Sequence, residues 1–145
     1  MYSHILFPTD GSDCADAALD HALEHARTYD ATLVALYVAD VREVGYAAPA
    51  LSLERVREAL LDSGEQVVDR VTERAREAGV EVETAVSEGT PASEIIRHAD
   101  ERDVDLVVMG THGRSGIDRY LIGSVAERVV RGSDAPVLTV RQDST

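Results

Sequence analysis

The chain has 145 residues, enough for one domain with a substantial hydrophobic core, and 44% of its residues are hydrophobic. Its formal charge is −13, from 27 acidic and 14 basic residues, and every basic residue is Arg because the sequence contains no Lys. This charge argues against nucleic acids and anionic membranes as partners, since both favour a basic patch. The dispersed acidic residues favour a halophilic protein that works in molar salt, where repulsion between charges is screened within about 3 Å.

Cysteine usage and the start of the chain bear on the cellular compartment. The lone Cys14 cannot form a disulfide within the chain, which fits a reducing cytosol. No apolar stretch approaches the length of a membrane span, and residues 1–8 lack the basic start and long apolar region of a signal peptide. We therefore expect a cytoplasmic protein that folds as a single domain over residues 1–145.

Hydrophobic periodicity divides the chain into alternating strands and helices. Apolar or alternating runs predict five strands, over residues 2–7, 32–38, 80–86, 104–109 and 135–140. Apolar residues at helical spacing predict helices that start at Ser12 or Asp13, at Ser52, at Thr90 with Pro91, and at Val125. Residues 39–51 fit neither pattern and are interpreted as a loop.

The helix predicted from Ser52 to Ala78 is the longest element, and Gly79 is expected to end it. One side of this helix is apolar and is expected to face the core. Its members are Leu53, Val56, Leu60, Val67, Val68 and Val71.

The alternation of strands and helices predicts the fold. It implies an α/β protein with a five-stranded parallel sheet, helices on both faces and right-handed crossovers. In the order 3-2-1-4-5, the carboxyl ends of the first and fourth strands flank the crevice where ligands bind to such sheets. The turn at residues 8–11 and the segment after residue 109 would then meet at this crevice.

A strand, a glycine-rich loop and a helix N-terminus follow one another near the C-terminal end. The apolar run 104–109 leads into Gly110-Thr111-His112-Gly113, and Gly123-Ser124 precedes the last helix. Glycine lets the backbone approach a ligand closely, and the N–H groups of a first helical turn favour a phosphate. The pattern indicates a nucleotide-binding site. A conventional P-loop is excluded because it requires a Lys.

Two of these residues also have a purely local interpretation. Ser124-Val125-Ala126-Glu127 fits a capping box, in which the Ser124 hydroxyl accepts from the Glu127 N–H. Asp10 has a local alternative role, as an Asx-turn residue that ends the first strand.

The arginine and histidine side chains are candidates for phosphate, metal and catalytic groups. Arg114 and Arg119 could bind phosphate or could be solvated surface residues. His21 and His25 stand one helical turn apart, but no third ligand is evident, so we expect no metal site. Asp118 and His112 are the possible general bases beside the glycine-rich loop, but neither has an orienting partner visible in the sequence, so we assign no catalytic residue.

Three parts of the chain together resemble the universal stress protein family. They are residues 7–12 (FPTDGS), residues 107–116 (VVMGTHGRSG), and residues 123–127 with 135–140. The resemblance spans the full chain. The motif of the nucleotide-binding branch, G-x2-G-x9-G-[S/T], is matched in every term by Gly110, Gly113, Gly123 and Ser124.

The resemblance implies a Rossmann-like fold of the adenine nucleotide alpha hydrolase kind, with ATP, ADP or AMP as ligand and Mg²⁺ held by the phosphates. It places adenine near Asp10 and Val38, and ribose near Pro8 and Gly110. The complete set of implied nucleotide-binding positions is Pro8, Thr9, Asp10, Val38, Met109, Gly110, His112, Gly113, Arg114, Gly123, Ser124, Val125 and Ala126.

A homodimer is expected through residues 136–140. This fifth strand would be an apolar edge, and an uncovered apolar edge invites pairing with a second copy. The alternative is that a helix or Pro136 protects the edge.

Three functions stay open at this point. The first is an ATP-binding regulatory or stress-response protein with little turnover. The second is a slow ATP hydrolase or phosphotransferase, and the third is a dimeric adaptor without nucleotide turnover.

Overall fold

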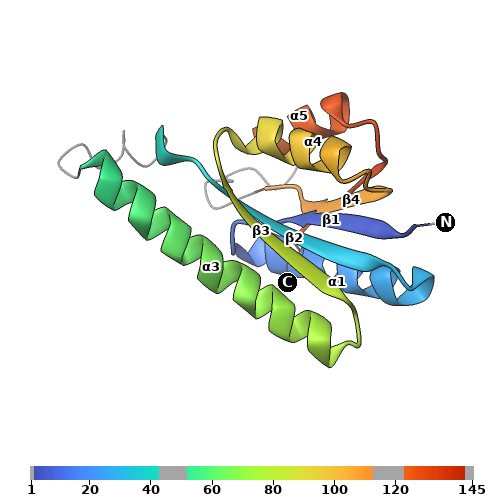
Figure 1. Ribbon diagram of the computed structural model, residues 1–145. Helices are drawn as coiled ribbons and strands as arrows, with labels where there is room; N and C mark the ends of the chain where they lie inside the picture. The colour runs from blue at the N-terminus through green and yellow to red at the C-terminus, as the bar shows by residue number, and fades with distance from the viewer. Residues whose placement is uncertain (1, 43–51, 113–122, 143–145) are drawn as a thin grey trace.

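Five parallel strands form one sheet in the computed structural model, which describes residues 2–42, 52–112 and 123–142 (Figure 1). The strand order is β3-β2-β1-β4-β5, and all neighbouring strands are parallel. The predicted α/β class and strand order are therefore confirmed. In chain order the elements are β1 (His4–Pro8), α1 (Asp13–Tyr29), β2 (Thr32–Ala39), α3 (Leu53–Glu77), β3 (Val82–Glu88), α4 (Pro91–Glu101), β4 (Leu106–Gly110), α5 (Ser124–Gly132) and β5 (Val137–Val140).

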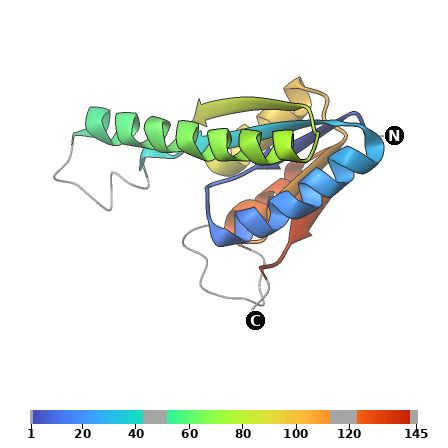
Figure 2. The ribbon, with the colours of Figure 1, turned by 90° about the horizontal axis from the view of Figure 1, so that it is seen from below.

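Helices cover both faces of the sheet, α1 and α3 on one side and α4 and α5 on the other (Figures 1 and 2). Successive strand residues point to opposite faces. In β1, Ile5 and Phe7 therefore join the core under α1 and α3, while Leu6 joins the core under α4 and α5.

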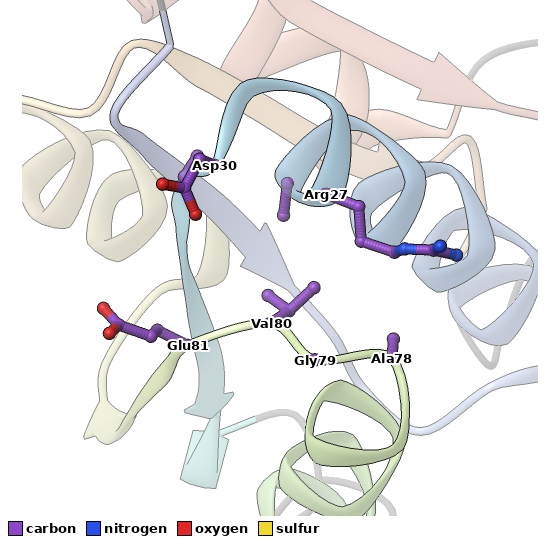
Figure 3. A pocket seen from close by; sticks show the side chains of 8 residues that line it. Arg27, Asp30, Ala78, Gly79, Val80 and Glu81 are labelled. Atoms are coloured by element: carbon purple, nitrogen blue, oxygen red, sulfur yellow. The ribbon is translucent and has the colours of Figure 1, made fainter.

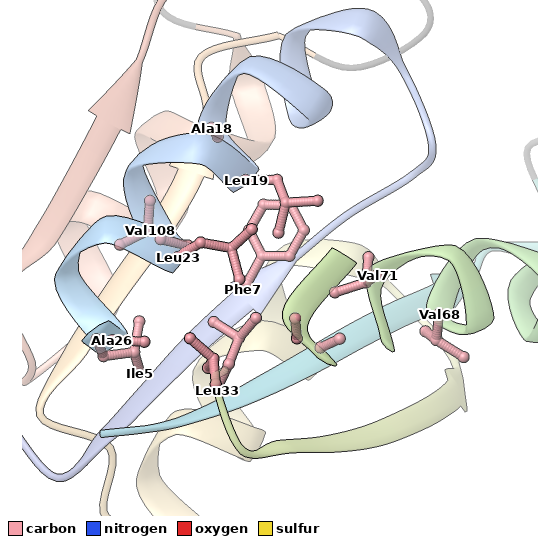
Figure 4. Packing of buried hydrophobic residues seen from close by; sticks show 14 of the residues in the cluster. Ile5, Phe7, Ala18, Leu19, Leu23, Ala26, Leu33, Val68, Val71 and Val108 are labelled. Atoms are coloured by element: carbon pink, nitrogen blue, oxygen red, sulfur yellow. The ribbon is translucent and has the colours of Figure 1, made fainter. Parts of the chain in front are cut away.

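The first of these cores is centred on Phe7, which is fully buried next to Leu19 and Leu23 of α1 (Figure 4). Truncation of such a side chain to Ala costs about 3–5 kcal/mol.

Short local signals start and end the helices where the sequence predicts. The Ser12 hydroxyl accepts from the Ala15 N–H at 3.2 Å, so Ser12, and not Asp13, is the N-cap of α1. The Ser52 hydroxyl caps α3 in the same way, by accepting from Arg55 N–H at 3.2 Å. Gly79 follows α3 with φ of 73°, the left-handed conformation that favours glycine.

Two predictions along α3 and β3 are wrong in detail. Leu53 is 65% exposed because it is the first residue of a helix whose N-terminal end extends beyond the sheet (Figure 2). β3 begins at Val82 instead of Val80, because the Val80 N–H is used to close the end of α3 on the Ala75 carbonyl at 2.8 Å.

α4 starts at the predicted residues. Thr90 holds the N-cap position with Pro91 next to it, but its side chain makes no capping hydrogen bond. Its hydroxyl instead accepts from the Arg42 guanidinium at 2.6 Å, which ties the end of β2 to the start of α4.

Candidate functional site

The strand order reverses between β1 and β4, because the chain runs from β1 outward to β2 and β3 on one side, and from β4 to β5 on the other. The carboxyl ends of β1 and β4, at Pro8 and Gly110, therefore flank the crevice where ligands bind in sheets of this kind. Among the described residues, the two buried polar side chains are Thr9 and Thr111, and each directly follows one of these strands. Both sides of the crevice are thus built around a buried threonine.

The turn after β1 is fixed by its own hydrogen bonds. The Thr9 N–H donates to the Leu36 carbonyl at 2.9 Å, and the Thr9 hydroxyl accepts from the Gly11 N–H at 3.1 Å. The Asp10 carboxylate accepts from the Ser12 N–H at 3.0 Å, so the Asx-turn interpretation of Asp10 is confirmed. This turn places Asp10, half-buried, between the end of β1 and the N-terminus of α1.

The backbone of Thr111, which directly follows β4, forms hydrogen bonds with two other parts of the fold. Its N–H donates to the Val140 carbonyl at 3.0 Å, and its carbonyl accepts from the Gly123 N–H at 2.8 Å. Residues 111 and 123 are therefore joined although eleven residues separate them in the chain. This contact brings the start of α5 to the end of β4, as the glycine pattern predicts.

The capping box predicted at Ser124 is not formed. Gly123 is the N-cap of α5, Ser124 is its first residue, and the Glu127 N–H donates to the Gly123 carbonyl at 3.0 Å. Ser124 is exposed, and the N–H groups of the first helical turn have no partner within the helix itself. The hydroxyl is therefore one residue too far into the helix to act as its cap.

The side chains at several predicted positions are used by the core. Met109 and Ala126 are 6% and 2% exposed and belong to the core under α4 and α5. Val38 and Val125 are half-buried and pack against the same core. Met109, Ala126 and Val125 can thus meet a ligand chiefly through the backbone. Gly113 and Arg114 lie outside the described residues, as do Asp118 and Arg119.

Two motif glycines are needed for packing. A Cβ on Gly110 would lie 2.9 Å from the Cys14 Sγ and 3.1 Å from the Cys14 carbonyl oxygen. A Cβ on Gly123 would lie 2.7 Å from the Thr111 carbonyl oxygen. The backbone at Gly110 thus approaches α1, and that at Gly123 approaches β4, more closely than any side chain allows.

At this edge of the sheet, helix N-termini lie beside charged side chains, among them Asp13 and Asp16 in the first turn of α1. The N-termini of α1 and α5 both lie here and favour an anion. Toward β3, Arg57 pairs with Glu88 at 2.8 Å. The Glu94 carboxylate accepts from Arg97 and from the Ser87 hydroxyl, and these bonds lower the pKa of Glu94 to about 2.

A hollow lies at the opposite, amino edge of the sheet, between the C-terminal ends of α1 and α3 (Figure 3). Its lining includes Arg27, Asp30 and Glu81, and its volume is about 300 Å³. Two helix C-termini and two carboxylates disfavour a phosphate there. The crevice at the carboxyl edge is therefore the better candidate site for an anionic ligand.

The sequence places Cys14 on a helix near the rim of this crevice, and it does not single out Thr111 as a residue of the site. Cys14 is buried, and its Sγ lies 3.5 Å from the Val140 carbonyl oxygen and 3.8 Å from the Thr111 hydroxyl. Thr111 was inside the glycine motif, but nothing in the sequence marked it as a contact between strands and helices. The two histidines of α1 have a local role: the His25 Nδ1 lies 2.8 Å from the His21 carbonyl oxygen.

The described ranges hold neither a cluster of metal ligands nor a helix that could span a membrane. In residues 2–42, 52–112 and 123–142, no three His, Cys, Asp or Glu side chains are grouped as metal ligands. No helix in those ranges is long and apolar enough to cross a bilayer.

Strand order, layers and crevice define a doubly wound α/β protein whose ligands are expected at the carboxyl edge of the sheet. The family model described as "Universal stress protein family" matches residues 1–141, and the chain belongs to this family. It is 43% identical over 143 residues to universal stress protein MJ0531 of Methanocaldococcus jannaschii, which covers 98% of this chain and 84% of that protein.

Two solved structures show how far the likeness extends in space. Protein MJ0577 of the same organism superimposes with a TM-score of 0.88 at 29% identity, covering 100% of this chain and 99% of that one. A universal stress protein in complex with cAMP superimposes with a TM-score of 0.71 at 29% identity, covering 98% of both chains.

Proposed function

We propose that this universal stress protein binds ATP, or ADP or AMP, in the crevice between β1 and β4 and acts as a nucleotide-dependent regulatory protein. The observation that carries the proposal is the contact between Thr111 and Gly123, which brings the N-terminus of α5 to the end of β4. First-turn N–H groups of α5 then face the region where a phosphate would lie. A structurally similar family member forms a complex with cAMP, which supports an adenine nucleotide as ligand.

In this proposal the adenosine lies at the end of β1 and β2, near Pro8, Thr9, Asp10 and Val38. The phosphates lie against the α5 N-terminus, near Gly110 and His112 on one side and near Gly123 and Ser124 on the other. Gly113 and Arg114, outside the described residues, complete the proposed phosphate contacts, and the phosphates carry any Mg²⁺.

The proposal is tested by calorimetric titration of purified protein with ATP, ADP and AMP. Ser124→Glu adds a carboxylate at the exposed first residue of α5. A carboxylate in the first turn favours the helix, so the fold is retained, but it repels a phosphate at the same place. We expect the affinity for ATP to fall at least tenfold.

Ser93→Glu is the matched control, because Ser93 is exposed in the first turn of α4, which follows the edge strand β3. We expect its affinity to equal that of the unmodified chain. Equal affinities for all three proteins would place the ligand elsewhere. Protein that binds none of the three nucleotides at millimolar concentration would refute the proposal and leave the dimeric adaptor.

The slow ATP hydrolase is the second candidate, and the sequence gives it no general base with an orienting partner. Release of ADP from bound ATP at a rate above that of Ser124→Glu would support it.

A dimer through β5 also belongs to this proposal, because β5 pairs with β4 alone among the described strands and is half-buried along most of its length. Light scattering that shows a monomer in multimolar salt would refute the dimer.

A further inference from the structure

Thr111 makes more contacts across the crevice than its place in the motif suggests. It is 4% exposed, and its backbone joins β5, through the Val140 carbonyl, to the N-cap of α5, through the Gly123 N–H. Its hydroxyl oxygen lies 3.0 Å from His112 Nδ1 and 3.8 Å from Cys14 Sγ. One buried residue therefore touches β5, α5, α1 and the imidazole of His112.

The direction of the hydroxyl hydrogen follows from the acceptors around it. Cys14 has one S–H hydrogen, and the Val140 carbonyl at 3.5 Å can only accept it. The Thr111 O–H then has two possible acceptors, an imidazole nitrogen at 3.0 Å and a sulfur at 3.8 Å. Sulfur is a weak acceptor, and the nitrogen is closer. The hydroxyl therefore donates to Nδ1, and the hydrogen of neutral His112 is on Nε2.

The imidazole of His112 also lies close to the start of α5. A Cβ on Gly123 would lie 3.6 Å from His112 Cδ2, the ring carbon bonded to Nε2. This side of the ring therefore lies close to the N-cap of α5, and Nε2 is one bond away from Cδ2. The Nε2–H is a hydrogen-bond donor next to the first-turn N–H groups, where the proposed function puts a phosphate.

We propose that Thr111 is a positioning residue of the nucleotide site: its hydroxyl holds neutral His112 with an Nε2–H donor beside the N-terminus of α5. The inference rests on the proposed function for its ligand. The tautomer that it assigns is a property of the free protein.

The first experiment tests the tautomer without nucleotide. Long-range ¹H–¹⁵N spectra at pH 8, with the His112 signals assigned by their loss in His112→Gln, show which ring nitrogen carries hydrogen. We expect Nε2–H in the unmodified chain and in Thr111→Ser, and a mixture of tautomers in Thr111→Val. An Nδ1–H form in the unmodified chain, or an unchanged spectrum in Thr111→Val, would overturn the inference.

The second experiment tests the link to the ligand by titration with ATP. Thr111→Val should weaken binding about tenfold, the effect of losing one well-placed hydrogen bond, and Thr111→Ser should restore it. The matched control is Thr72→Val, which removes a half-buried hydroxyl that donates to the Val68 carbonyl of α3 at 2.9 Å, near the amino edge of the sheet. It should bind as the unmodified chain does.

The outcomes separate the inference from the function on which it rests. If the unmodified chain binds no nucleotide, the proposed function fails and the nucleotide part of the inference fails with it, whatever the tautomer. If the unmodified chain binds ATP and Thr111→Val binds equally well, the role of Thr111 is refuted and the proposed function stands. A thermal unfolding scan of each variant establishes that it is folded before either comparison.

Discussion

Replacement of Gly110 by Ala probes the closest approach of β4 to α1 and needs no ligand. The added methyl group would lie 2.9 Å from the Cys14 Sγ and 3.1 Å from both the carbonyl carbon and the carbonyl oxygen of Cys14. The backbone of Cys14 cannot move away freely, because Cys14 lies in the first turn of α1, which Ser12 caps. The contact must therefore be relieved by a shift of the helix or of the strand.

Two effects of opposite sign set the size of the change. Forcing a methyl group into a packed site costs about 1–3 kcal/mol. Replacing Gly by Ala stabilises by about 0.4–1 kcal/mol through the unfolded chain. We expect overpacking to dominate, with a net loss of about 1–2 kcal/mol in the free energy of unfolding. For a chain of this size each kcal/mol lowers Tm by about 2–4 °C.

Urea unfolding of the free protein measures this loss, and a double-mutant cycle identifies its cause. Cys14→Ala removes the sulfur but leaves the two backbone atoms at 3.1 Å, so it should recover about half of the Gly110→Ala penalty. The control is Gly132→Ala, whose methyl group would meet only the flexible end of Ile96, at 2.6 Å from Cδ1. Its effect should stay within about 0.5 kcal/mol. A Gly110→Ala protein with the same free energy of unfolding as the unmodified chain would refute this explanation. Additive effects of Gly110→Ala and Cys14→Ala would also refute it.

Three further predictions concern stability. The Asp105 carboxylate accepts from the N–H groups of Ser3 at 2.7 Å and His4 at 3.0 Å, and these bonds lower its pKa. Because the pKa is lower in the folded state, this contribution is present above the unfolded pKa of about 4 and is lost as pH falls through the folded value. Asp105→Asn should therefore cost about 1 kcal/mol at pH 7 and flatten the acid side of the stability profile, as urea unfolding from pH 7 to pH 2 would show. Gly64→Ala should destabilise by about 1 kcal/mol, because a Cβ would lie 2.6 Å from Cδ1 of the buried Tyr37 ring and this overpacking exceeds the gain in helix propensity; chemical denaturation that finds the variant more stable would contradict this. Finally, the charge of −13 predicts that thermal stability rises from low to multimolar KCl as repulsion is screened, and a Tm independent of KCl would argue against the halophilic interpretation.

The sequence by itself determined the α/β class and the alternation of strands and helices, whereas the order 3-2-1-4-5 was an expectation that the fold confirms. Buried strands such as β1 and β4 are short apolar runs, and helices such as α1 combine a Ser cap with apolar residues at helical spacing. These signals are local, so they survive without knowledge of the packing. Boundaries were less certain where one residue can serve two elements, as Val80 does between α3 and β3.

The glycine motif correctly indicated that β4 and α5 meet, but it did not show which neighbouring atoms require glycine at these positions. A Cβ at Gly110 would lie within 3 Å of the Cys14 Sγ, and one at Gly123 within 3 Å of the Thr111 carbonyl oxygen, and only the folded chain brings these neighbours close. The sequence did not determine the role of Ser124 either. In the folded chain Gly123 is the N-cap of α5, whereas a capping box requires Ser124 at that position.

Tertiary structure alone placed Cys14, Thr111 and Val140 together, from α1, from the end of β4 and from β5. Their separations in the chain reach 126 residues, so no periodicity or spacing could report the contact. The physical reason is that local patterns record which face of an element is buried, whereas hydrogen bonds between elements depend on how those faces are stacked.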